Sequence, residues 1–304
     1  MKLIDGKLTS AEIKKEIAVE VAKMIDNDVP APHLAAILVG EDPASQSYVG
    51  AKEKDCKSVG MTSSVYRMPD TTTEEELLGT IDFINQDQDI DGLIVQLPLP
   101  DHINVDKVIS TINPAKDVDG FHPQNVGKMM LGWPTYLPAT PFGIVELLER
   151  NGIETSGKNC VVLGRSNIVG SPMSVLMSRK AKTGNATVTL CHSRTKNIKE
   201  ICSQADILIA AIGVPEFVTA EFVKKGATVI DVGIHRVKSD KTKSGFKLIG
   251  DVKFDEVSEV AGAMTPVPGG VGPMTRVGLL LNTLKSAQGK IYPNYRDNLK
   301  KDKA

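Results

Sequence analysis

The chain has 304 residues, of which 41% are hydrophobic and 24% are charged, and its formal net charge is −1. These proportions are typical of a soluble globular protein, and the length is sufficient for two domains. Because the net charge is close to zero, nothing in the composition favours a nucleic acid or an anionic membrane as a partner.

Cysteine usage and apolar runs indicate the compartment. The four cysteines show no C-x-x-C spacing and no zinc-like pairing with histidine, so we expect reduced thiols and no metal site. The N-terminus becomes charged too early for a signal peptide, and no apolar run approaches the roughly 20 residues that span a bilayer. The sequence therefore predicts a cytoplasmic protein.

Helical and strand-like segments alternate along the chain, which predicts an α/β protein with parallel sheets. In the first half we expect helices over 9–26, 43–59 and 71–85 and strands over 33–40, 63–68 and 91–100. Thr9 or Ser10 is expected to cap the first helix, and Asp42-Pro43 opens the second. Residues 113–141, which are richer in Gly and Pro, are expected to contain a linker.

The second half has the same alternation. We expect a helix near 143–151, strands near 158–166, 186–190, 205–213, 227–233 and 262–267, and a further helix after Pro273. The charged residues RDNLKKDKA at 296–304 are expected to form a solvated end.

A glycine-containing turn follows an apolar strand at VVLGRSNIVGSP (161–172). Gly164 and Gly170 stand between that strand and a helix, as in dinucleotide-binding folds, where helix N-terminal amides face the pyrophosphate. The spacing departs from G-x-G-x-x-G because Ser166 stands where the second glycine would be. The strand context favours a cofactor site, and a purely structural turn is the alternative.

The end of the next strand bears on the choice between NAD and NADP. NAD-selective sites place an Asp or Glu there to bind the ribose 2′-hydroxyl. This strand instead ends in His192, Ser193 and Arg194, and Arg165 lies in the glycine turn. Cationic and hydroxyl side chains suit a 2′-phosphate, which favours NADP. Exposed loop residues without a ligand are the alternative.

Two predicted elements carry polar side chains that are candidates for a functional site. Tyr48 and Lys52 lie four residues apart on the predicted helix 43–59, hence on one face. Gln96 lies near the carboxyl end of a predicted strand, the edge of a parallel sheet at which ligands bind. Helix packing explains the first pair equally well, and a structural hydrogen bond at the sheet end explains Gln96.

Two loop segments complete the candidate site. Asp117 and Asp119 lie in the polar segment PAKDVDGF (114–121), which resembles a ligand-binding loop, and a turn-forming Asp-Gly is the structural alternative. TPVPGGVGPMT (265–275) is a stiff loop, with Pro273 placed for the first turn of a helix. Such a loop lets backbone approach a ligand closely, and a plain hinge has the same composition.

Five segments together resemble one enzyme family over nearly the whole chain. They are SYVGAKEKDC around Lys52, GLIVQLPLP (92–100), PAKDVDGF, GRSNIVGSP (164–172) and TPVPGGVGPMT. The sequence is similar to the bifunctional methylenetetrahydrofolate dehydrogenase/methenyltetrahydrofolate cyclohydrolase family, of the bacterial FolD type. The resemblance implies an enzyme of one-carbon metabolism that oxidises 5,10-methylenetetrahydrofolate with NADP+ and hydrolyses the methenyl product to 10-formyltetrahydrofolate.

The resemblance also implies a role for each matching residue. Lys52 would be the acid/base residue of the hydrolytic step, with Tyr48 beside it stacking on the folate. Gln96 would hydrogen-bond the Lys52 amine, and Asp119 would anchor the pterin ring. Further folate contacts would come from Val95, Leu97, Pro268, Gly269, Gly270, Gly272, Pro273 and Thr275. The NADP contacts would come from Gly164, Arg165, Ser166, Ile168, Gly170, Ser193 and Ile234.

In architecture, the resemblance implies two α/β domains with parallel sheets and a cleft between them. A folate-binding catalytic domain would comprise 1–138 plus 273–304, and a Rossmann-like NADP-binding domain 139–272. The resemblance also implies a homodimer. Two positions depart from the family pattern, namely Ala139, where many relatives have Cys, and His235, where Asn is common.

Both chemical steps act on one carbon. Hydride leaves readily because the adjacent nitrogens stabilise the resulting cation, so oxidation needs positioning more than a base. Hydrolysis adds water to the same carbon, where Lys52 can act as a neutral amine or by protonating a nitrogen. The presence of Tyr48, Lys52, Gln96 and Asp119 together favours both activities over a monofunctional member or a non-catalytic dinucleotide-binding regulator.

Overall fold

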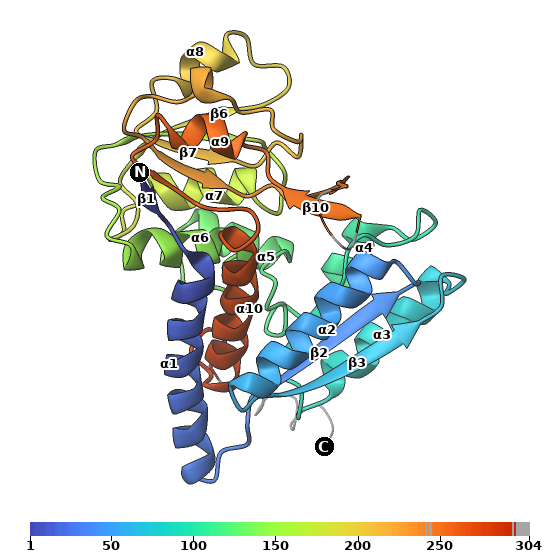
Figure 1. Ribbon diagram of the computed structural model, residues 1–304. Coiled ribbons are helices and arrows are strands. Elements are labelled where there is room, and N and C mark those ends of the chain that lie inside the picture. The colour runs from blue at the N-terminus through green and yellow to red at the C-terminus, as the bar shows by residue number, and fades with distance from the viewer. Residues whose placement is uncertain (241, 243–244, 294, 296–304) are drawn as a thin grey trace. The chain divides into compact units, whose positions relative to one another are not determined.

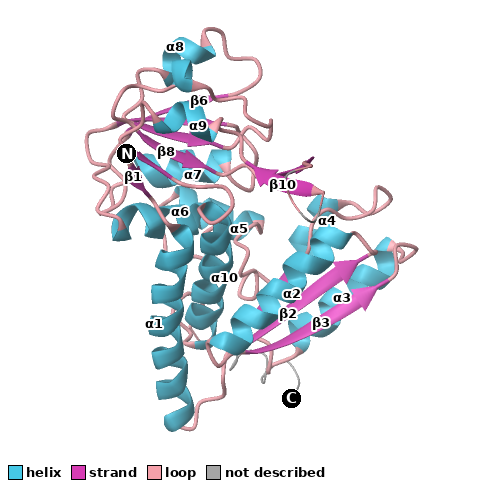
Figure 2. Cartoon of the chain, viewed as in Figure 1, coloured by secondary structure: helices cyan, strands magenta, loops and turns pink. Residues whose placement is uncertain are grey.

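The computed structural model describes residues 1–240, 242, 245–293 and 295, and the chain forms two compact units (Figure 1). The first unit comprises Met1–Ala11 and Thr140–Thr275, and the second comprises Glu12–Ala139 and the residues from Arg276 onward. Figure 2 shows that helices and strands occur together in each unit, as predicted for an α/β protein. The expected solvated end at 296–304 lies outside the described residues.

A six-stranded parallel sheet forms the centre of the first unit, in the order β1-β11-β8-β7-β5-β6. Its strands are β1 (Lys2–Leu3), β5 (Asn159–Leu163), β6 (Thr187–Cys191), β7 (Ile207–Ala210), β8 (Thr228–Asp231) and β11 (Ala263–Met264). All but β1 confirm predicted strands. The next two strands along the chain, β6 and β7, lie on opposite sides of β5, so the carboxyl end of β5 is a topological switch point.

Short helices and one hairpin complete the first unit. The helices are α6 (Ala139–Arg150), α7 (Gly170–Ser178), α8 (Ile198–Cys202), the 3-10 helix η1 (Ala220–Phe222) and α9 (Phe254–Ser258). The hairpin pairs β9 (His235–Lys238) with β10 (Phe246–Ile249) in antiparallel fashion, and the sequence patterns did not predict it. The helix expected near 143–151 is confirmed as α6, which begins four residues earlier.

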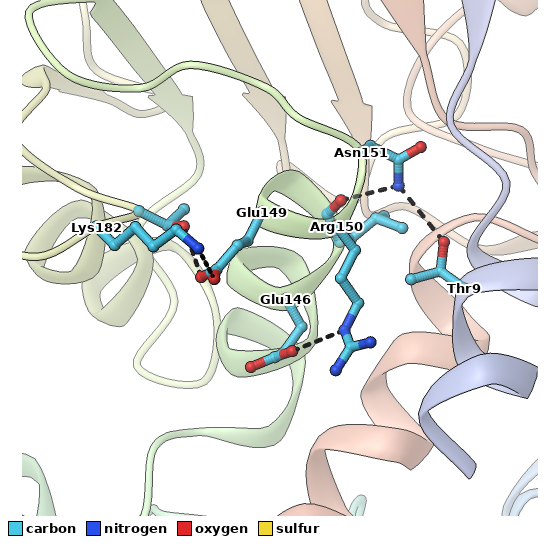
Figure 3. A network of polar contacts seen from close by, with 8 residues as sticks. Thr9, Glu146, Glu149, Arg150, Asn151 and Lys182 are labelled. Atoms are coloured by element: carbon cyan, nitrogen blue, oxygen red, sulfur yellow. Dashed lines mark hydrogen bonds and ion pairs between the residues drawn. The ribbon is translucent and has the colours of Figure 1, made fainter. Parts of the chain in front are cut away.

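The N-terminal residues belong to the first unit because β1 pairs in parallel with β11, with Lys2 opposite Ala263. The residue that follows α6 also holds this segment, since the Asn151 side-chain amide donates to the Thr9 hydroxyl at 3.4 Å (Figure 3). The Lys2 amine also donates to the carbonyl of Asn151. A two-residue strand carries no periodic signal, and so the sequence patterns did not predict this pairing.

The division therefore differs from the expected domains at three places. Residues 1–11 fall in the first unit rather than with the predicted folate domain, 1–138 plus 273–304. The two later boundaries lie at 139/140 and 275/276 rather than 138/139 and 272/273. The physical reason for the first difference is the strand pairing of β1.

The second unit is built on a three-stranded parallel sheet in the order β3-β2-β4. Its strands are β2 (His33–Val39), β3 (Thr62–Met68) and β4 (Gly92–Val95), which confirm the three predicted strands. Its helices are α2 (Pro43–Ser58), α3 (Glu74–Gln86), α4 (Val105–Thr111) and α5 (Pro123–Met130), with parts of α1 (Gly6–Asp26) and α10 (Val271–Ala287). None of the described helices is long and apolar enough to cross a membrane.

Both faces of this sheet are covered. Ala35, Ile37 and Val39 of β2 point to one face, where they pack with Leu77 and Ile81 of α3. The alternate residues of β2 are buried on the opposite face, and α2 lies against β2 and β3 (Figure 1). Burial on both faces explains why β2 reads as a continuous apolar run rather than an alternating one.

The helix caps decide where the predicted helices start. The Asp42 carboxylate accepts from the Ser45 backbone amide at 2.7 Å, which confirms the predicted start of α2. The predicted cap of α1 is wrong, because that helix begins at Gly6 and an Asp5 oxygen accepts from the Leu8 amide. The Thr9 hydroxyl instead bonds back to the carbonyl of Asp5, inside the helix.

The segment expected to contain a linker, 113–141, is largely packed into the second unit. It contains α5, and the Lys116 side chain is buried with its amine on the carbonyls of Ile84 and Asp87. In this way Lys116 caps the carboxyl end of α3. One feature of the segment agrees with the expected linker, because the boundary between the two units lies within it, at 139/140.

Asn282 of α10 holds the same segment from the other side. Its amide donates to the carbonyls of Val118 and Leu137, each at 2.8 Å, and the side chain is buried. We predict that Asn282→Leu, which has a similar volume, lowers the free energy of unfolding by about 2 kcal/mol, because one buried and one partly buried carbonyl lose their donor. Urea-induced unfolding measures this change.

Thr283→Val is the matched control for that substitution. The Thr283 hydroxyl is equally buried, but it bonds to the carbonyl of Leu279 in its own helix. We expect Thr283→Val to cost less than half as much as Asn282→Leu. Equal losses for the two variants would contradict the role given to Asn282.

Candidate active site

The centre of the candidate site in the second unit is the buried amine of Lys52, whose residue is 7% exposed. The amine donates to Oε1 of Gln96 at 3.2 Å and lies 4.8 Å from the centre of the Tyr48 ring. Tyr48 and Lys52 come from adjacent turns of α2, and Gln96 follows the last residue of β4. The structure thus brings together three side chains that the sequence placed on two separate elements.

The orientation of Gln96 is fixed by its own hydrogen bonds. Its backbone amide donates to the carbonyl of Ile37, which extends the pairing of β4 with β2 by one residue. Its side-chain nitrogen donates to the carbonyl of Leu97 at 2.6 Å. Because the amide nitrogen is used in this way, the oxygen faces Lys52 as an acceptor.

Burial governs the charge of the site. It lowers the pKa of the Lys52 amine, and the negative charge of Asp119 opposes that shift only in part. Burial also raises the pKa of the Asp119 carboxyl, against the opposing effect of Lys52. Both shifts favour the uncharged form, so the site provides a neutral amine at a lower pH than an exposed lysine would.

The two aspartates of the 114–121 segment have different surroundings. Asp117 is buried and accepts from the backbone amides of Phe121 and His122 and from the Asn125 side chain. Asp117 therefore stabilises the conformation of the loop through these hydrogen bonds. Asp119 is partly exposed, and its negative charge acts on the Lys52 amine.

Sequence patterns missed an ion cluster one turn beyond Lys52. The Asp55 carboxylate of α2 contacts the Lys14 amine and the Arg276 guanidinium, each at 2.5 Å. Lys14 lies on α1 and Arg276 on α10, so the cluster fastens α2 to both helices. No local pattern signals it, because the partners lie 41 and 221 residues from Asp55 along the chain.

Val95 and Leu97, two of the residues expected to contact the folate, lie near Asp119. Val95 is buried at the end of β4, and Leu97 follows Gln96. Both line a small cavity that Asp119 also lines. The cavity therefore combines apolar side chains with the carboxyl groups of Asp117 and Asp119.

The glycine turn of the first unit lies at the carboxyl end of β5. Gly164 adopts a φ of +123°, and a Cβ at this position would lie 2.0 Å from the carbonyl oxygen of Ala211. The Ser166 hydroxyl accepts from the amides of Val169 and Gly170, at 3.2 and 3.4 Å. Ser166 thus closes the turn, a structural role that the sequence reasoning did not give it. Arg165 and Ile168 are exposed.

The end of β6 lies beside this turn. Leu163 of β5 pairs with Cys191 of β6, so Arg165 and Ser193 both lie two residues beyond a paired position at the same sheet edge. A tight turn follows β6, in which the His192 ring accepts from the Arg194 amide at 3.1 Å. Ser193 and Arg194 are exposed there.

These features fit a dinucleotide that carries a 2′-phosphate. A backbone cradle that only glycine allows stands at the switch point of the sheet, and the neighbouring strand ends in His-Ser-Arg-Thr without a carboxylate. Exposed guanidinium and hydroxyl groups at that edge match a phosphate in charge and hydrogen bonding. Ile234, also predicted to contact the cofactor, follows β8 and is 55% exposed.

The predicted folate wall at 268–275 lies in the first unit. Pro268, Gly269 and Gly270 form a turn, whereas Gly272, Pro273 and Thr275 lie inside α10, which begins at Val271 rather than after Pro273. The Thr275 hydroxyl bonds to that of Thr140 at 3.0 Å. Part of the segment expected as a loop is therefore the first turn of a helix.

Comparison with known proteins identifies the relatives of the chain. The model described as "Tetrahydrofolate dehydrogenase/cyclohydrolase, catalytic domain" matches residues 4–119, and the one described as "Tetrahydrofolate dehydrogenase/cyclohydrolase, NAD(P)-binding domain" matches 138–291. The chain is 60% identical over 287 residues to the bifunctional protein FolD of Cytophaga hutchinsonii, which covers 94% of this chain and 99% of that protein. The bifunctional protein FolD of Bacteroides fragilis is 59% identical, over 96% and 100% of the two chains.

Solved structures agree with these relatives. The bifunctional enzyme FolD from Campylobacter jejuni superposes with a TM-score of 0.89 at 45% identity, over 95% of this chain and 99% of that one. The methylenetetrahydrofolate dehydrogenase-cyclohydrolase of Trypanosoma brucei, solved with NADP cofactor and inhibitor, has a TM-score of 0.89 at 37% identity, over 95% and 98%. The chain therefore belongs to the tetrahydrofolate dehydrogenase/cyclohydrolase family.

Proposed function

We propose that this chain is a bifunctional enzyme that oxidises 5,10-methylenetetrahydrofolate with NADP+ and hydrolyses the methenyl product to 10-formyltetrahydrofolate. The observation that carries the proposal is the buried Lys52 amine, hydrogen-bonded to Gln96 beside the Tyr48 ring. It occurs in a chain whose other unit carries a turn suited to a dinucleotide. Family membership supports both halves of the proposal.

The residues of the second unit would bind the folate. Asp119 offers a carboxyl group that can pair with the amino group and ring nitrogen of the pterin, and Tyr48 offers an aromatic face for stacking. Val95 and Leu97 supply apolar wall on the same side as Asp119. Family resemblance supports residues 268–275 as further folate contacts.

The residues of the first unit would bind NADP, which supplies the hydride acceptor of the oxidation when it is bound. Gly164, Ser166 and Gly170 form the turn for the pyrophosphate, and Arg165 and Ser193 stand where the 2′-phosphate is expected. The chain needs no general base for this step, because the neighbouring nitrogens of the folate stabilise the positive charge that hydride loss creates.

Lys52 would serve the hydrolytic step. Its neutral amine accepts a proton as the oxygen of water bonds to the methenyl carbon. The ammonium then returns that proton to the ring nitrogen that leaves when its bond to this carbon breaks. The second proton of water goes to solvent, which balances the positive charge of the methenyl substrate. Gln96 holds the amine in line for both transfers.

We also propose that the enzyme acts in the cytoplasm as a homodimer. The four cysteines, which are all free and buried, support the cytoplasmic assignment, and family resemblance supports the homodimer. A monofunctional enzyme and a non-catalytic regulator are the competing functions. The intact set of Tyr48, Lys52, Gln96 and Asp119 favours the bifunctional enzyme over both.

Substitution of Lys52 separates the two activities. We predict that Lys52→Met lowers the rate of methenyltetrahydrofolate hydrolysis by at least about 100-fold, because the acid/base group is lost. Hydride transfer, followed by the absorbance of NADPH and the methenyl product, should fall by less than about tenfold. Lys54→Met, at an exposed position of the same helix, is the control and should leave both rates unchanged. Equal loss of both activities in Lys52→Met contradicts this role.

The pH dependence of hydrolysis reports the state of the Lys52 amine. Since burial lowers the pKa of Lys52, its amine loses the proton at a lower pH than ordinary lysine side chains. We predict that kcat/KM for hydrolysis rises with pH and reaches a plateau before exposed lysines titrate. Rates of Lys52→Met, measured in parallel, correct for hydrolysis by hydroxide. A flat profile, or one that falls with pH, is incompatible with a neutral-amine mechanism.

Ser193 tests the cofactor assignment. An added carboxylate at this position would repel a 2′-phosphate and accept from a ribose 2′-hydroxyl. We predict that Ser193→Asp lowers the ratio of kcat/KM with NADP+ to that with NAD+ by about 100-fold. Ser156→Asp, which adds the same charge at an exposed serine before β5, should leave the ratio unchanged. A wild-type enzyme that prefers NAD+ would overturn the assignment of Arg165 and Ser193.

A further inference from the structure

A buried carboxylate in the first unit joins two loops at the edge of its sheet. Asp251 is fully buried, and its Oδ2 accepts from the backbone amide of Gly213 at 2.9 Å. Its Oδ1 lies 2.7 Å from Nε2 of His235. Gly213 follows β7 and His235 begins β9, so one side chain connects segments that enter from different strands.

The surroundings of Asp251 leave little freedom for the residues around it. A Cβ on Gly233 would lie 2.3 Å from Oδ1 of Asp251, so only glycine permits this approach. A second buried carboxylate, that of Asp231, accepts from the amides of Gly233 and Asp251 at 3.0 and 2.9 Å. Ile234 therefore stands between one neighbour fixed through Asp231 and another, His235, fixed through Asp251.

This network lies at the sheet edge that carries the glycine turn. Ala210 of β7 pairs both with Leu163 of β5 and with Asp231 of β8, so the three strands end in register. The loops that hold Gly213 and Ile234 thus leave the sheet at the same edge as the turn at Gly164. Ile234 presents a large apolar side chain that is 55% exposed at an edge where a flat ring can lie on it.

We propose that His235 is a positioning residue for the cofactor. By donating its Nε2 hydrogen to Asp251, which also binds the Gly213 amide, it holds Ile234 in the arrangement that receives the nicotinamide half of NADP. The inference rests on the proposed NADP-dependent function and extends it to a residue that departs from the common family pattern.

The exposure of the His235 ring separates positioning from stability. Its side chain is 20% exposed, so water can reach Oδ1 of Asp251 once the ring is removed. The carboxylate then keeps a partner, and the fold is expected to survive. What is lost is the bond that ties the start of β9 to Asp251, and with it the fixed position of Ile234.

Two substitutions separate the hydrogen bond from the ring. His235→Phe keeps the ring and removes the donor, whereas His235→Gln keeps a nitrogen donor at about the reach of Nε2. Arg236→Gln is the matched control, because the next residue of a strand points to the opposite face and Arg236 is exposed against the Phe246 ring. For each variant we measure the NADP dissociation constant by calorimetry, KM for NADP+, kcat, the hydrolysis rate and the melting temperature.

We expect His235→Phe to raise both the dissociation constant and KM for NADP about tenfold, the effect of one hydrogen bond to a charged group. Hydrolysis of the methenyl substrate, which uses no cofactor, should stay within about twofold of the wild type. His235→Gln should restore NADP affinity to within about threefold, and Arg236→Gln should bind like the wild type. If His235→Phe does not fold, His235→Ser, which admits water, takes its place.

Three results would overturn the inference. They are wild-type NADP affinity in His235→Phe, an affinity in His235→Gln as weak as in His235→Phe, and a loss of hydrolysis in step with the loss of NADP binding. The last would mean that His235 only supports the fold. A wild-type protein that does not bind NADP would instead refute the proposed function, so the two failures are distinguishable.

Discussion

The candidate site of the second unit depends on the hydrogen bond between the Lys52 amine and the Gln96 side-chain amide. A buried amine is unfavourable unless its environment either pairs its charge or makes the neutral form easy to reach. Here a neutral oxygen accepts the bond, and Asp119 supplies only a partial counter-charge. The parallel sheet places Gln96 at its edge, and the α2 helix brings Lys52 to it. The acid/base chemistry proposed for the chain follows from that balance.

The first unit solves a different physical problem, which is the approach of backbone to an anionic ligand. Several strands of its sheet end in register, so the segments that follow them lie at the same edge of the sheet. Glycine at position 164 permits the close turn. The buried carboxylates of Asp231 and Asp251 hold the neighbouring loops by accepting hydrogen bonds from their backbone amides. The second unit thus provides a buried amine for acid/base chemistry, and the first provides a backbone turn already arranged to bind an anion.

The sequence predicts the elements whose signals are local. The apolar runs of β2 and β5, the Asp42 cap of α2 and the glycine turn at 164–170 were all readable, because each depends on neighbouring residues. It missed β1 and the Asp55 ion cluster, because these depend on partners far away in the chain. The contact between Lys52 and Gln96 is an intermediate case. Local patterns indicated each residue as a site candidate, but only the family resemblance implied that the two are paired.

Burial lowers the pKa of the Lys52 amine, so this amine becomes neutral at a pH where exposed lysines are still charged. A titration of the lysine side chains by NMR tests this, in protein labelled with ¹³C at the lysine ε-carbons and with the Lys52 signal assigned from its absence in Lys52→Arg. We predict that the Lys52 signal titrates at a clearly lower pH than those of the exposed lysines. A Lys52 signal that titrates together with those of Lys54 and the other exposed lysines would contradict it.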